Sequence, residues 1–200
     1  MNPILSKEEL EKLSGLKGNV RGMGMKNYAK FILEKEGKEG LKKLEEAMAQ
    51  IGYPVKYEEL KAMSLYPLRT ETATLILIKR LFNYDDRKFQ EMGRFGVKFS
   101  MLIKLFMKYF VSLEKLVKEA PKMWKKGGTL GDFRVAEYDL VKKQLTLRIE
   151  NFNVHPLYCE IFKGYFAGAF QMIINKKIEC KETECSFKGG RYHEFQLQWQ

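Results

Sequence analysis

Four side chains in the last quarter of the chain have the types and spacing of a metal site. Cys159 precedes Glu182 by 23 positions, Cys185 follows three positions later, and His193 lies eight beyond that. Glu-x-x-Cys has the pitch of a Cys-x-x-Cys knuckle, and a hairpin turning at 189–190 would place Cys185 opposite His193. Two thiolates, a carboxylate and an imidazole form a tetrahedral set that zinc accepts. Protein would fill all four positions, so the pattern predicts a structural zinc ion and not a catalytic one.

Other interpretations of these residues stay open. Cys180 and Glu182 share a parity on one predicted strand, so Cys180 could replace Glu182 as a ligand. Cys159 follows Pro156 in the first turn of a predicted helix, where the helix dipole favours a thiolate. That position would also suit a nucleophile beside His155, but the sequence identifies no third group to orient such a pair. A free cysteine can also be a small buried apolar side chain.

Hydrophobic periodicity predicts the elements that must position these residues. In the C-terminal half, alternating residues predict two pairs of strands with a helix between them, over 133–138, 145–150, 156–174, 178–182 and 195–199. Before residue 127 the period is helical, and Ser6-x-x-Glu9 is a capping box that opens the first helix. Helices are expected over 28–36, 41–51, 57–63, 70–82, 86–111 and 113–126, the last bent or broken at Pro121. The fold class is therefore α+β, with a helical N-terminal half packed on a C-terminal β-β-α-β-β unit that forms a small antiparallel sheet.

The predicted helix over 86–111 is apolar around almost its whole circumference. This pattern is typical of a buried core helix, and it would equally line an apolar ligand cavity. Gly164 and Gly168 lie one turn apart on the predicted helix over 156–174, which indicates that another element or a ligand approaches closely there. The candidate pocket residues on these two helices are Phe106, Phe110, Phe162, Tyr165 and Phe166.

Composition bounds the remaining function classes. A chain of 200 residues can bury roughly 70% of its unfolded surface, so it needs no disulfide to fold. Three cysteines and a polar start fit a reducing cytoplasm, and no apolar run reaches the roughly 20 residues of a membrane span. The net charge of +11 would attract nucleic acid or an acidic membrane surface, but 25 acidic residues are interleaved with 36 basic ones. Nucleic acid is therefore an unlikely partner, since neither a basic block nor an aromatic stacking platform is apparent.

The chain resembles the 4-vinyl reductase domain, which is named for bacteriochlorophyll biosynthesis proteins and also serves as the sensor module of hydrocarbon-responsive transcription activators. The resemblance is carried by Phe152, His155-Pro156, Cys159, Gly164-Tyr165, Gly168, Glu182-x-x-Cys185, Gly189 and Phe195. The N-terminal half is similar to a family of myxobacterial proteins of about this length. The fold that the resemblance implies is that of transport-protein-particle subunits and haem nitric-oxide sensors, in which helices and a small sheet enclose an apolar cavity.

The resemblance also implies a ligand set. In the aromatic-sensing members zinc is held by Cys, Glu, Cys and Cys, and the first three fall by spacing on Cys159, Glu182 and Cys185. The fourth falls on His193, so this chain departs from the pattern there. The polar residues that anchor phenol in those sensors have no convincing match, and Trp124 and Tyr138 are the candidates.

These observations together predict a cytoplasmic small-molecule binding or sensor module with an apolar pocket and structural zinc. Residues 1–89 would form the helical region and residues 90–200 the ligand-binding domain. The expected ligand is a small apolar or aromatic molecule, and the expected assembly is a homodimer. A tetrapyrrole-modifying, vinyl reductase-like enzyme is the alternative, although the sequence has no dinucleotide fingerprint, redox pair or open metal position. An adaptor that uses the fold for assembly is another. Haem binding is a further variant, for which His155 would be the histidine left outside the zinc site.

Overall fold

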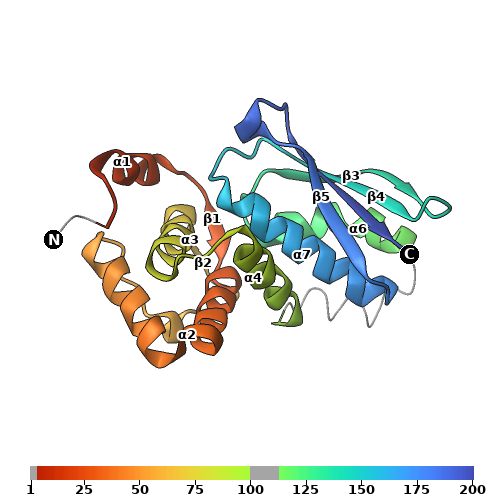
Figure 1. Ribbon diagram of the computed structural model, residues 1–200. Coiled ribbons are helices and arrows are strands. Elements are labelled where there is room, and N and C mark those ends of the chain that lie inside the picture. Colours follow the sequence, from red (N-terminus) through yellow and green to blue (C-terminus); the bar gives the residue numbers. More distant parts are fainter. Residues whose placement is uncertain (1–3, 100–112) are drawn as a thin grey trace. The chain divides into compact units, whose positions relative to one another are not determined.

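The computed structural model describes residues 4–99 and 113–200 (Figure 1). Its contacts divide the chain into two compact units, Met1–Asp85 and Asp86–Gln200, called unit 1 and unit 2 below. The predicted helix over 86–111 is seen as far as Phe99, and the candidate pocket residues Phe106 and Phe110 lie outside the described residues. No helix among the described residues is both long and apolar enough to cross a membrane.

Unit 1 is helical, as the periodicity of its sequence predicts. Its elements are α1 (Lys7–Gly15), β1 (Asn19–Arg21), α2 (Met23–Gln50), η1 (Tyr57–Glu59), β2 (Leu65–Pro67) and α3 (Leu68–Phe82). The capping box is confirmed, because Ser6 Oγ accepts a hydrogen bond from the amide of Glu9 at 3.2 Å and the Glu9 carboxylate accepts one from the amide of Ser6 at 2.8 Å. Gly37 breaks the α2 helix with φ of 71°, a left-handed conformation that glycine adopts without strain. The antiparallel pair β1–β2 was not predicted, because three residues are too few to show alternation.

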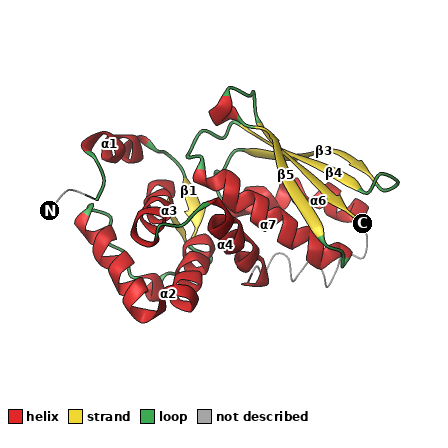
Figure 2. Ribbon diagram, in the orientation of Figure 1, coloured by secondary structure: helices red, strands yellow, loops and turns green. Residues whose placement is uncertain are grey.

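Unit 2 contains the predicted β-β-α-β-β unit (Figure 2). Its elements are α4 (Asp86–Phe99), α6 (Leu113–Gly127), β3 (Asp132–Asp139), β4 (Gln144–Glu150), α7 (Leu157–Ile174), β5 (Ile178–Glu184), η2 (Ser186–Lys188) and β6 (His193–Trp199). The four strands form one antiparallel sheet in the order β3-β4-β6-β5. Helix α6 continues through Pro121, where a bend or break was expected. The α+β fold class is confirmed.

One face of this sheet is apolar and is covered by helices. Leu145, Leu147 and Ile149 of β4 are fully buried, while Arg134 pairs with Glu150 and Arg148 with Glu194 on the opposite face. This alternation is what an antiparallel sheet with one wet face requires. Helices α6 and α7 meet the apolar face, where Trp124 stacks on Phe133 with ring centroids 5.1 Å apart.

Helix α4 packs against α7 so closely that only glycine fits at the contact. A Cβ atom on Gly164 would lie 1.9 Å from the carbonyl oxygen of Gln90, and one on Gly93 would lie 2.2 Å from that of Ile161. The predicted close approach at Gly164 is therefore to the backbone of α4. This packing fixes the position of α7, whose first turn carries Cys159.

Candidate functional site

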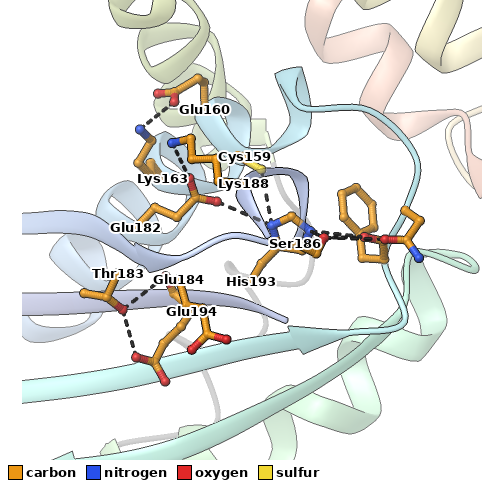
Figure 3. Close-up of polar contacts among 12 residues, drawn as sticks. Cys159, Glu160, Lys163, Glu182, Thr183, Glu184, Ser186, Lys188, His193 and Glu194 are labelled. Atoms are coloured by element: carbon orange, nitrogen blue, oxygen red, sulfur yellow. Dashed lines mark hydrogen bonds and ion pairs between the residues drawn. The ribbon is translucent and has the colours of Figure 1, made fainter. Parts of the chain in front are cut away.

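Cys159, Glu182, Cys185 and His193 lie together in unit 2, although they come from α7, β5, β6 and the turn that joins the two strands. One ligand atom from each lies within 4.8 Å of the others. Figure 3 shows three of the four, Cys159, Glu182 and His193, with their side chains turned toward one another. Cys159 is in the first turn of α7, Glu182 is on β5, and His193 is the first residue of β6. Cys185, Cys159 and His193 are buried, and the Glu182 side chain is only 5% exposed.

The turn between β5 and β6 begins at Cys185, directly after the last residue of β5. The amides of Lys188 and Gly190 both donate to the carbonyl oxygen of Cys185, at 3.0 and 2.9 Å. Gly189 has φ of 89°, so it reverses the chain at the position where the sequence predicts the hairpin turn. A register shift between Glu182 and Glu184 rotates the end of β5 as it enters this turn.

His193 presents its Nδ1 atom to the cluster. Nδ1 lies 3.4 Å from Cys159 Sγ and 3.4 Å from Glu182 Oε1. Nε2 faces the other way, 3.1 Å from the carbonyl oxygen of Phe152 and 2.6 Å from Ser186 Oγ. A backbone carbonyl partner on one ring nitrogen leaves the other available as a ligand, which is the usual arrangement around a metal-binding histidine.

The electrostatics of the cluster centre on Glu182. Burial alone would raise the pKa of Glu182, but hydrogen bonds from His193, Cys159 and Cys185 outweigh it and lower the pKa to about 2. Burial, followed by the charge of Glu182, raises the pKa of Cys159. Burial, followed by a hydrogen bond to Glu182, raises the pKa of Cys185. Without an ion the two thiols are therefore protonated and donate to an ionised carboxylate. A cation bound in their place would displace both thiol protons, and its positive charge would offset the buried negative charges of the two thiolates and Glu182.

The raised pKa of Cys159 argues against a nucleophilic thiol. An activated cysteine has a lowered pKa and some exposure, whereas Cys159 is 3% exposed and neighbours a carboxylate. The imidazole beside it is that of His193, and His155 instead accepts a hydrogen bond from the amide of Leu157 at 3.2 Å through its Nδ1 atom. The arrangement suits binding of a cation by four protein ligands.

Neighbouring residues that the sequence left open lie outside the cluster. Cys180 is on β5 but is not among the four grouped residues, and burial raises its pKa to about 12. The carboxylate of Glu184 accepts a hydrogen bond from the amide of Arg191 at 2.8 Å. Sequence reasoning missed Ser186 and the carbonyl of Phe152. The position of Ser186 directly after Cys185 could have indicated its hydroxyl as a partner of the cluster. The contact of the Phe152 carbonyl could not be predicted, because it involves no side chain of Phe152.

Three of the candidate pocket residues lie together between α6, α7 and the sheet. Trp124 is 5.3 Å from Phe162 and 6.1 Å from Phe166, measured between ring centroids, and the two phenylalanines are 5.9 Å apart. Tyr165 is half-buried and packs with Val97 and Ala169 at the contact of α4 and α7. Tyr138 is 42% exposed at the end of β3. The structure thus gathers Trp124, Phe162 and Phe166, places the Tyr165 ring edge-on to Phe166 at 6.1 Å between centroids, and leaves Tyr138 exposed at the end of β3.

Comparison with solved structures identifies proteins with a similar fold. An H-NOX protein from Shewanella oneidensis in the Fe(II)NO state matches with a TM-score of 0.68 at 15% identity, over 90% of this chain and 99% of that one. The Fe(II) unliganded H-NOX protein from K. algicida matches with a TM-score of 0.64 at 14% identity, over 90% and 96% of the two chains. The chain has the fold of an H-NOX domain. No protein-family model matches its sequence, and no curated protein does.

The H-NOX fold corrects two predictions. The resemblance to the 4-vinyl reductase domain is wrong, because no family model supports it and the matching structures are H-NOX domains. That pattern consisted of scattered cysteines, glycines and aromatic residues, which different folds can share. Structural zinc as the cofactor is also wrong on this comparison, because the group named in the matching structures is Fe(II) or haem. The predicted likeness to haem nitric-oxide sensors, in contrast, is confirmed for the fold.

Proposed function

We propose that this chain is a non-enzymatic sensor module that binds a small apolar molecule within residues 90–200. The observation that carries the proposal is the extent of the structural likeness, which covers 90% of this chain and 99% and 96% of the two H-NOX chains named above. The likeness therefore extends over the whole H-NOX fold and not over a shared fragment, which supports the proposal. We expect a homodimer, in which the second copy offers a surface through which the signal can pass. Reduced thiols at the cluster favour a cytoplasmic location.

The interior of unit 2 supports an apolar ligand. Helices α6 and α7 face the sheet with aromatic rings, and Phe195 contributes a further ring 5.3 Å from Phe166. Such a ligand would bind mainly through burial of apolar surface, at about 25 cal/mol per Å².

Haem, which the H-NOX proteins carry, does not fit the described residues of unit 2. Haem iron is held in proteins by an axial side chain, most often histidine. The chain has two histidines. His193 has both ring nitrogens engaged by neighbouring protein groups. His155 accepts the amide of Leu157 at Nδ1, which places the proton of the neutral ring on Nε2, the nitrogen that an iron would need. The proposal therefore assigns the apolar interior to a ligand other than haem.

We also propose that Cys159, Glu182, Cys185 and His193 bind one transition-metal ion. The proximity of their ligand atoms, within 4.8 Å, supports the site, and two thiols select for soft or borderline ions. With four protein ligands the ion would join the start of α7 to both ends of the β5–β6 turn. Its contribution would be to stability, since a site of this kind is formed only in the folded chain.

The decisive experiment for the sensor is native mass spectrometry of the freshly purified protein, with its absorption spectrum recorded alongside. We expect a retained small molecule, a mass increment of one metal ion, and a dimer. A Soret band would contradict the assignment of a ligand other than haem. Protein that carries no small molecule and takes up no apolar probe, such as an environment-sensitive naphthalene dye, would contradict the sensor function.

The metal site has a matched pair of variants on one short stretch. Cobalt(II) added to chelator-treated protein should give thiolate charge-transfer absorption, and Cys185→Ser should abolish it. Cys180→Ser should leave it unchanged, because Cys180 lies outside the four grouped residues. Melting temperatures should fall for Cys185→Ser and His193→Ala far more than for Cys180→Ser. Equal melting temperatures with and without chelator would count against a bound ion.

A further inference from the structure

The turn that joins β3 to β4 exposes large apolar side chains. Leu140 is 56% exposed and Val141 is 92% exposed, and Tyr138 just before them is 42% exposed. Single exposed apolar residues are ordinary on protein surfaces. Two consecutive exposed apolar residues at the end of a hairpin form a small apolar patch. Residues 138–143, which contain this patch, are called the hairpin tip below.

The hairpin tip is held by its own hydrogen bonds. The Asp139 carboxylate accepts from the amides of Val141 and Lys142, both at 2.9 Å. The amide of Trp199 donates to the carbonyl oxygen of Lys143 at 3.2 Å, which ties the turn to the end of β6. Ordered backbone on both sides means that Val141 is presented to solvent by the fold.

Lysines surround this apolar point. Lys142 and Lys143 follow Val141 directly and are exposed. The pairing of Ile178 with Trp199, and of Gln198 with Gln144, brings the start of β5 to the same end of the sheet. Exposed Lys176 and Lys177 precede that strand, so four lysines lie at this end, and the carboxylate of Asp139 is paired with Lys142 at 3.5 Å. Figure 1 shows the hairpin at the end of the sheet where the C-terminus is drawn.

We propose that the hairpin tip docks on an anionic lipid bilayer. Val141 and Leu140 enter the interface, and the four lysines contact the acidic headgroups while their stems lie along the apolar boundary. A lipid surface fits this shape better than a protein does. A stable protein interface buries roughly 800 Å² on each partner, which exceeds what a few turn residues offer, whereas a bilayer needs only a few anchors.

Vesicle co-sedimentation tests the proposal on the full chain. The protein should pellet with vesicles of equimolar phosphatidylcholine and phosphatidylserine and stay in solution with phosphatidylcholine alone. Binding should weaken as salt is added, because exposed charges are screened. Equal pelleting with both vesicles, or with neither, would overturn the proposal.

Paired variants separate this docking from general positive charge. Lys142→Gln with Lys143→Gln should reduce the partition coefficient about 30-fold, at about fivefold per lysine. The control is Lys42→Gln with Lys43→Gln, an exposed adjacent pair on α2 that changes the net charge equally and should have little effect. Equal losses for the two pairs would show attraction by net charge only and overturn the proposal.

A third variant reports entry of the tip into the lipid. Val141→Trp should bind at least as well as the parent chain, and its emission should be quenched by brominated lipid in anionic vesicles. Val141→Ser should lower the partition about tenfold through the loss of apolar burial. Binding without quenching, or Val141→Ser binding like the parent, would refute insertion. A different outcome would be a parent chain that binds no vesicles but forms dimers, which Val141→Ser dissociates. That result would show that the hairpin tip contacts a second copy of the chain.

Discussion

Replacement of Gly164 by alanine probes the contact on which the position of α7 depends. The new Cβ atom would lie 1.9 Å from the carbonyl oxygen of Gln90, and the next two atoms it meets are also backbone atoms of Gln90. No side chain can rotate to relieve this overlap. To reach an ordinary contact of about 3.4 Å, α4 and α7 must separate by about 1.5 Å.

The expected loss follows from two opposed effects. Overpacking of a closed contact costs about 1–3 kcal/mol and occasionally more, and a backbone overlap belongs at the upper end of that range. In the opposite direction, alanine has a higher helix propensity than glycine, which stabilises the helix by about 1 kcal/mol. We therefore expect Gly164→Ala to lower the free energy of unfolding of unit 2 by about 2 kcal/mol. For a chain of this length that corresponds to a melting temperature lower by roughly 4–8 °C.

Urea unfolding followed by tryptophan fluorescence is the suitable assay. Both tryptophans, Trp124 and Trp199, lie in unit 2, so their emission reports that unit without a contribution from unit 1. Gly127→Ala is the matched control, because it also falls on a helix of unit 2 and its Cβ atom would meet nothing within 4 Å. The control should be neutral or slightly stabilising.

Two outcomes would refute the reasoning. Gly164→Ala as stable as the parent would mean that α4 does not approach α7 as closely as the glycines indicate. Gly93→Ala addresses the same contact from the other helix, at 2.2 Å from the carbonyl oxygen of Ile161. The double variant should lose less than the sum of the two single losses, because one separation of the helices relieves both overlaps. Strict additivity would contradict a shared contact.

Two further predictions concern Glu182 and the first helix. In chelator-treated protein the pKa of Glu182 is lowered from 4.5 to about 2, so its contribution is present above about pH 4.5 and lost as the pH falls toward 2. Glu182→Gln should flatten this acid loss of unfolding free energy, by at most about 3 kcal/mol, and an unchanged profile would contradict the assignment. Ser6→Ala should cost about 1 kcal/mol of local stability and speed amide exchange in the first turn of α1, where Glu9 N donates to Ser6 Oγ. Exchange no faster than in the parent would show that the cap is dispensable.

The order of elements could be predicted from the sequence because it depends on local period. Alternation of Leu145, Leu147 and Ile149 with polar neighbours is sufficient to indicate a half-buried strand, and the structure places those three on the covered face. Gly37 was likewise visible as a break. The pair β1–β2 could not be predicted, since its partners are separated by more than 40 positions and each is only three residues long.

The candidate metal site was predicted by residue type and only assembled by the fold. Equal parity on one strand could not choose between Cys180 and Glu182, and the position of α7 over the end of the sheet decides which of them meets Cys159. Nδ1 of His193, and not Nε2, faces the cluster because Nε2 contacts the carbonyl oxygen of Phe152. Every residue has a backbone carbonyl, so the sequence cannot indicate which one makes this contact. The mistaken family resemblance has the same origin, because spacing along the chain constrains neither the path of the backbone nor what it encloses.

The sequence by itself therefore determined the elements and the wet and buried faces of the strands, since these depend on neighbours within a few positions. It also supplied the residue types of the candidate metal site. Only the tertiary structure decided the strand order β3-β4-β6-β5, the glycine contact between α4 and α7, and the H-NOX likeness. Those features arise from the burial of apolar faces that lie far apart in the chain, and their free energy is gained only when the whole unit closes around them.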